Sequence, residues 1–157
     1  MSSKNTMYSI TEGVFITEPP VMDRSIQILM FRDPSDHEYR VVITRAALAK
    51  EQTQEEWIEK EMENLRFCLP GFQIEGKQLK HQIGPAKLDV IQVANRYLDE
   101  GDVVRQVQSV IKLPKHERYN PIERDVLVFT LQANNEEFTE YQRKHYVQII
   151  NSYSPAI

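Results

Sequence analysis

The sequence is poor in the residues that enzymes, metal sites and disulfide-bonded folds most often need. Its 157 residues include one cysteine, Cys68, and only five glycines. A single cysteine excludes an internal disulfide and a cysteine-cluster metal site. Neither a phosphate-binding glycine loop nor a Gly-x-Ser-x-Gly motif occurs, and the four histidines lack zinc-binding spacing. We therefore expect a protein that is not an enzyme and that carries no metal or cofactor.

The sequence also lacks a positive charge excess and a long apolar run. The net charge is −4, which gives no basic field for nucleic acid or an anionic membrane. No segment approaches the roughly 20 apolar residues that span a bilayer, and the N-terminus lacks the apolar core of a signal peptide. These absences predict a cytoplasmic protein without direct membrane anchoring. Its length fits one domain over residues 1–157.

The most informative segment that is present is Arg24–Phe31, which is apolar on both faces if it is extended. In a strand, alternate side chains point to opposite faces. Ile26, Ile28 and Met30 then share one face, and Leu29 and Phe31 share the other. Turn-forming residues at 33–36 and a second apolar stretch, 38–45, predict an antiparallel hairpin. The apolar side chains on both faces of this hairpin must therefore be buried against other parts of the protein or against a partner.

The clearest helix follows the hairpin. Thr53 and Glu56 form a capping box that predicts its start, and Pro70-Gly71 predicts its end. Between them, four apolar residues recur at helical spacing: Ile58, Met62, Leu65 and Leu69. We expect Cys68, near the end of this helix, to be a buried thiol.

The rest of the chain alternates like an antiparallel sheet and closes in a second helix. Strands are predicted at 72–83, 87–98, 103–113 and 125–133, with turns at Gly84-Pro85 and 99–102. Asn134 or Asn135 is expected to cap a helix whose spacing is kept by Phe138, Tyr141, His145 and Ile149. Upstream, residues 7–17 hold two apolar clusters separated by Glu12-Gly13. The fold class is α+β, with an antiparallel sheet flanked by two main helices.

The apolar surplus in the hairpin has two interpretations. The segments Ile28–Phe31 and Val41–Ile43 could form a central hairpin that the domain's own sheet and helices enclose. Alternatively, one face could stay open as an interaction groove or a dimer face. The residue pattern leaves both open.

Several short segments, in one order, resemble a known family. They are Ser25-Ile26-Gln27-Ile28, Val42-Ile43-Thr44-Arg45, Leu69-Pro70-Gly71-Phe72, a turn at Gly84, and Val104-Arg105-Gln106-Val107. Together they resemble the DcrB-like family, and within it the Eag chaperones of bacterial type VI secretion systems, over about residues 7–150. The resemblance implies a twisted sheet of the Mog1/PsbP-like kind.

The resemblance also implies a function. Eag chaperones are homodimers that bind the N-terminal transmembrane helices of PAAR-domain effectors, often Rhs toxins, before loading on the VgrG spike. The positions that match the family's client groove here are Ile26, Ile28, Val42, Leu65, Leu69 and Gln106. In this comparison Leu65 is larger than the alanine of some relatives, which implies a narrower groove. The amide of Gln106 is expected to bond the client's backbone or a small polar side chain.

A second function remains open from the same resemblance. A Mog1/PsbP-like domain of this kind could instead be a generic binding module that contacts a folded, soluble partner through a polar surface. The two hypotheses differ in whether an apolar helix binds.

Overall fold

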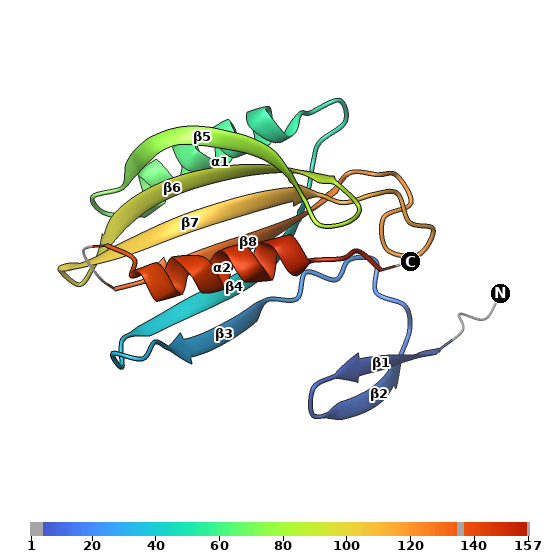
Figure 1. The fold of residues 1–157 in the computed structure, drawn as a ribbon. Helices are drawn as coiled ribbons and strands as arrows, with labels where there is room; N and C mark the ends of the chain where they lie inside the picture. Colours follow the sequence, from blue (N-terminus) through green and yellow to red (C-terminus); the bar gives the residue numbers. More distant parts are fainter. Residues whose placement is uncertain (1–4, 135–136, 157) are drawn as a thin grey trace.

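The computed structural model describes residues 5–134 and 137–156 and has the predicted α+β architecture (Figure 1). The elements follow the order β1 (Thr6–Ile10), β2 (Gly13–Thr17), β3 (Gln27–Arg32), β4 (Glu38–Ala47), α1 (Gln54–Cys68), β5 (Gln73–Ile83), β6 (Leu88–Asp99), β7 (Asp102–Lys112), β8 (Asp125–Ala133) and α2 (Glu140–Ser152). Antiparallel strands flanked by two helices confirm the predicted fold class.

Six strands form one antiparallel sheet in the order β3-β4-β8-β7-β6-β5. The strands β5 to β8 are neighbours in sequence and in space, joined by two short turns and by a longer loop before β8, and β8 then pairs with β4. The chain therefore leaves β4, passes through α1 and three strands, and returns beside β4. The short strands β1 and β2 pair only with each other, in a separate hairpin.

The strands β3 and β4 form an antiparallel hairpin, as predicted. Ile28 lies opposite Val42, and Met30 lies opposite Arg40. These side chains point to one face of the sheet, while Leu29 and Phe31 point to the other. The ladder begins at Gln27, so Ile26 lies just before β3.

Helix α2 covers one face of the sheet, in front of β8 and β4 in Figure 1. Tyr146 fixes it there through a buried hydroxyl group. That group donates to the Phe129 carbonyl oxygen at 2.9 Å and lies 2.6 Å from Ser109 Oγ. Because the tyrosine proton goes to the carbonyl, the serine hydroxyl is the donor in the second bond. Burial raises the pKa of Tyr146, which keeps the phenol neutral.

Helix α1 packs on the opposite face, behind the sheet in Figure 1. Its predicted capping box is present: Thr53 Oγ1 accepts from the Glu56 backbone at 3.1 Å, and Glu56 accepts from the Thr53 backbone at 3.2 Å. Ile58 and Met62 are buried in a cluster formed mainly by side chains of β6, β7 and β8. The helix is thus placed toward one side of the sheet, away from β3.

Two local predictions were wrong. Thr139, and not Asn134, caps α2: its hydroxyl accepts from the Gln142 backbone, and the Gln142 side chain accepts from the Thr139 backbone. This reciprocal pair satisfies two donors at the helix start, which a lone asparagine cannot do. Asn135 lies outside the described residues. Cys68 is exposed, because the buried stripe of α1 does not include it.

Asp33 joins the β3–β4 turn to the start of α2. Its carboxylate accepts backbone bonds from His37 and Ser35 at 2.8 and 3.0 Å, and side-chain bonds from Thr139 and Gln142 at 3.3 and 3.4 Å. The backbone N–H of His37 is the main cause that lowers the pKa of Asp33. The buried carboxylate therefore helps to hold α2 on the sheet.

We expect Tyr146→Phe to lower the free energy of unfolding by about 1–3 kcal/mol, because Ser109 and the Phe129 carbonyl lose a buried partner. Urea denaturation at pH 7 measures the change, with an unaltered slope m. Tyr141→Phe is the matched control, since Tyr141 is half exposed and its effect should stay within about 0.5 kcal/mol. Equal effects of the two substitutions would contradict the anchoring role of Tyr146.

Acid should weaken the fold through Asp33. Its folded-state pKa is depressed, so its contribution is present above the unfolded value of about 3.9 and is lost as pH falls through the folded value. We expect Asp33→Asn to reduce stability at pH 7 and to reduce it progressively less below about pH 5. Urea unfolding of both proteins across this range tests the sign. Asp99→Asn, at an exposed turn, is the control. If the difference in unfolding free energy between the unmodified protein and Asp33→Asn is the same at every pH, this linkage is refuted.

Candidate functional site

The α1 side of the sheet is uncovered at β3. Three large apolar side chains are exposed there, Ile26 at 62%, Ile28 at 60% and Met30 at 59%. Ile28 and Met30 stand at alternate positions of β3 and share one face, and Ile26 lies just before the strand. We call these three residues the exposed floor. A contiguous exposed apolar surface of this kind is typical of a binding surface rather than of a solvated strand.

The other apolar residues of the predicted groove lie on the same side of the sheet. Val42 is half-buried and directly opposite Ile28. Leu65 on α1 and Leu69, which caps the end of that helix, are half-buried against the core cluster under it. The predicted residues therefore form two groups, one on β3 and β4 and one on α1. The strands β6, β7 and β8 lie under the helix, and β4 is the next strand beyond them.

Gln106 is buried, with 7% of its surface exposed, and its amide is bonded within the protein. It donates to Asn95 Oδ1 at 2.8 Å and accepts from Gln132 Nε2 at 2.9 Å. Gln132 in turn accepts from Arg40 Nε at 3.0 Å. Asn95, Gln106, Gln132 and Arg40 are register partners on β6, β7, β8 and β4. We call these four residues the amide row.

The amide row is a satisfied polar network at one border of the open face. Gln132 also donates to the Tyr97 hydroxyl at 3.3 Å, and burial raises the pKa of Tyr97 so that the phenol stays neutral. The one charge, Arg40, lies 3.6 Å from a carboxylate oxygen of Glu38. The side-chain amide of Gln106 has a second N–H, which its bond to Asn95 does not use. The row ends opposite Met30, so it adjoins the exposed floor.

Sequence reasoning did not find the amide row. Its signal is polar residues among buried apolar ones: Asn95, Gln106 and Gln132 stand on the α1 face of three strands that also place buried valines on that face. One polar residue in a strand predicts only an exposed position. The register of four strands, which joins these residues into one row, follows from the tertiary structure.

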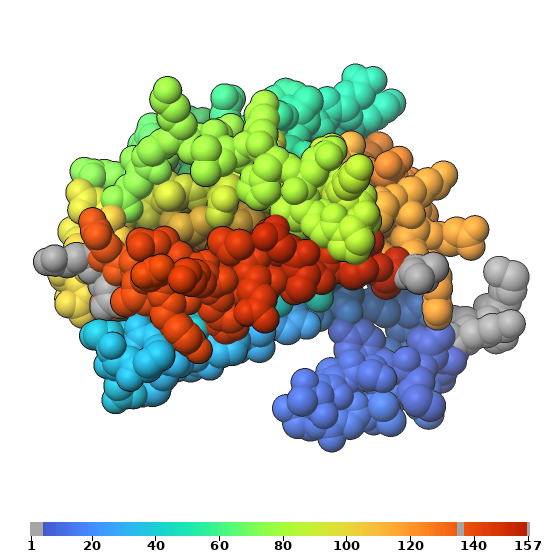
Figure 2. Space-filling view, in the orientation of Figure 1, coloured from blue at the N-terminus to red at the C-terminus, as the bar shows by residue number. Residues whose placement is uncertain are grey.

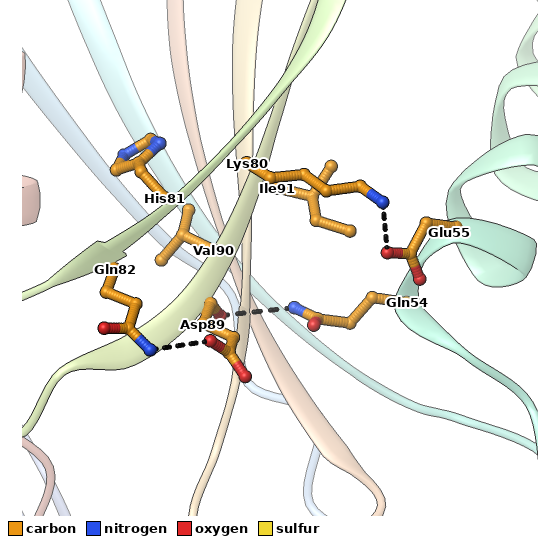
Figure 3. Close-up of a pocket in the computed structure, with 8 residues that line it drawn as sticks. All are labelled: Gln54, Glu55, Lys80, His81, Gln82, Asp89, Val90 and Ile91. Atoms are coloured by element: carbon orange, nitrogen blue, oxygen red, sulfur yellow. Dashed lines mark hydrogen bonds and ion pairs between the residues drawn. The ribbon is translucent and has the colours of Figure 1, made fainter.

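A cavity of about 330 Å³ lies elsewhere, between the start of α1 and the strands β5 and β6 (Figure 3). Its polar side chains bond one another: Lys80 pairs with Glu55 at 2.8 Å, and Gln82 donates to Asp89 at 3.3 Å. Gln54 donates to the backbone oxygens of Asp89 and Val110. These five polar side chains are therefore bonded within the protein and do not converge on a ligand.

The described residues show no other site with evident chemistry. Within them, no group of three or more histidine, cysteine, aspartate or glutamate side chains is arranged to hold a metal ion. Over the same part of the chain, no helix combines the length and apolarity needed to cross a bilayer. What the site can do, from its own residues, is to bury an apolar surface against the exposed floor.

The fold resembles two solved structures. PA94 from Pseudomonas aeruginosa, a protein of unknown function, matches with a TM-score of 0.74 and 19% identity, over 98% of each chain. LpqN of Mycobacterium tuberculosis, which is involved in cell envelope biogenesis, matches with a TM-score of 0.51 and 16% identity, over 85% of this chain and 78% of that one. At these identities the likeness concerns the fold.

The comparison by sequence gives a family. No curated protein matches the chain. The family model described as DcrB matches residues 12–152, which include every strand of the six-stranded sheet and both helices. The chain therefore belongs to the DcrB family.

Proposed function

We propose that this protein is a chaperone that shields apolar transmembrane helices of a secreted protein before export. The single observation that carries the proposal is the exposed floor, where three large apolar side chains lie open on β3 and just before it. Leu65 of α1 and Leu69 at its C-cap stand on the same side and would border a helix placed there. The amide row would border it at one end.

The free energies suit this role. A transmembrane helix in water exposes about 20 apolar side chains, each costing ~1.5–3 kcal/mol relative to burial. The total is tens of kcal/mol, which drives aggregation. An open apolar sheet face lowers this cost by contact alone, without a nucleophile, a metal or a nucleotide. A non-catalytic role is therefore sufficient.

The resemblance to Eag chaperones makes the proposal more specific. The client would be the N-terminal transmembrane segments of a PAAR-domain effector of the Rhs type. Binding would take place in the cytoplasm, by a homodimer, before the effector is loaded on the VgrG spike of a type VI secretion system. In this proposal the affinity comes from Ile26, Ile28, Val42, Leu65 and Leu69, and Gln106 offers its remaining N–H.

A charged side chain in the exposed floor should abolish binding. The probe is a fluorescent 20-residue helix of leucine and alanine with one Gly-x-x-x-Gly motif and terminal lysines, which imitates a packing-competent membrane segment. Ile28→Asp should weaken its binding at least about 30-fold, since the change loses roughly 2 kcal/mol of apolar contact and desolvates a carboxylate. Fluorescence anisotropy and the light scattering of the peptide measure the effect.

The matched control is Val147→Asp, which places the same charge on the exposed surface of α2. It should bind the peptide like the unmodified protein, and both variants should keep the circular dichroism of the fold. If Ile28→Asp binds as tightly as the control, the exposed floor is not the binding surface. If the unmodified protein leaves the peptide to aggregate, the generic module with a soluble partner is the better hypothesis.

A further inference from the structure

The hairpin of β1 and β2, which we call the arm, carries apolar side chains on both of its faces. Met7, Val14 and Ile16 share one face and are 69%, 61% and 71% exposed. Ile10 and Phe15 lie on the other face and are about half exposed. An isolated two-stranded hairpin is marginally stable in water. The arm therefore needs a surface to pack on.

The arm does not find that surface on its own sheet. Tyr8 fixes its base, through hydroxyl contacts with Asp23 and with Ser25 at 3.3 Å, just before β3. Beyond these contacts the arm projects from the body, and Figure 2 shows open space between the two. Among the described residues, the aromatic rings of the arm stack only on each other, in the pair of Tyr8 and Phe15.

A complementary surface exists on the same chain at the free edge of β3. This strand ends the sheet, and no described strand pairs with its outer side. Natural edge strands are usually protected by charge, proline or a covering segment. From Gln27 to Phe31 the strand has neither charge nor proline, and Leu29 and Met30 are 43% and 59% exposed.

We propose that the arm of one protomer docks along the β3 edge of a second copy, and that the second copy returns the same contact. Both surfaces belong to one chain, so a two-fold exchange covers both at once and closes without forming a fibre. The lengths agree: β1 and β2 have five residues each and β3 has six. The charges are compatible, because Glu12 is the only charged residue of the arm and Arg32 the only one of β3.

The exchange would also change the surroundings of the exposed floor. A second copy's arm beside β3 borders Ile28 and Met30 with further apolar side chains, on the side opposite α1. The face would then be incomplete in a single protomer. The docking itself does not depend on helix binding, so it can be tested without any client.

Site-directed cross-linking tests the exchange in the full chain. The exposed Cys68 is first replaced in Cys68→Ser, and Ile16→Cys and Met30→Cys are then made in two chains that carry different tags. After mixing, a short flexible bismaleimide should join the two chains to each other. Val147→Cys on α2, mixed with Met30→Cys, is the matched control and should give only background. A double variant with both cysteines that cross-links solely within one chain would overturn the exchange.

The oligomeric state gives the second measurement. Sedimentation equilibrium should show a dimer, and Ile16→Asp should raise its dissociation constant about tenfold or more, because the arm loses apolar contact and gains a charge. Val147→Asp should leave the constant unchanged. A protein that is monomeric at micromolar concentration, or a dimer that Ile16→Asp does not weaken, would overturn the proposal.

Discussion

The main physical constraint on this structure is that each helix is too narrow to cover a whole face of the six-stranded sheet. Six strands at about 4.8 Å span roughly 24 Å, whereas one helix with its side chains is about 10–12 Å wide. The sheet is apolar on both faces, and each face receives one main helix. Neither helix can cover its face alone. The remaining width must be filled by large side chains, by a satisfied polar network, or by another molecule.

The two faces meet this constraint differently. On the α2 face, aromatic rings extend the cover as far as β3: Phe31 packs against Tyr39 at 5.5 Å between centroids and edge-on to His145 at 4.7 Å. Tyr39 donates to or accepts from His145 Nδ1 at 2.7 Å, which satisfies its buried hydroxyl. On the α1 face, the helix packs on β6, β7 and β8, and Ile28 stays 60% exposed. Most of the exposed apolar surface of β3 thus lies on the α1 face, while Leu29 on the α2 face is 43% exposed.

Sequence patterns predicted the elements well because each depends on local chemistry. The alternation in Arg24–Phe31, the capping box at Thr53 and the turns at Gly84 and Gly101 are set by neighbouring residues. The pattern also showed that β3 was apolar on both faces. It did not predict which face would stay open, since that depends on where α1 lies across the sheet. Thr139 was missed for a related reason, because the apolar spacing begins one residue before the true cap.

Gln106 illustrates what a single position cannot tell. As a polar residue in a strand, it is equally compatible with an exposed surface and with contact to a client. Its neighbours in the sheet decide the matter, because Asn95 and Gln132 use its carbonyl and one N–H. A client that displaced either bond would leave a buried amide unsatisfied, at a cost of about 1–3 kcal/mol. The row therefore acts first as a rigid border for the open face.

That border has a consequence for selectivity. Apolar contact is non-directional, so the exposed floor alone would bind almost any apolar segment. A fixed row of amides beside it penalises a segment whose bulky apolar side chains cover those groups, and tolerates one that presents small or polar residues there. Transmembrane helices that pack through glycine, serine and threonine have that pattern. The combination of an open apolar floor and a closed polar row would thus favour helices that are already built to pack against other helices.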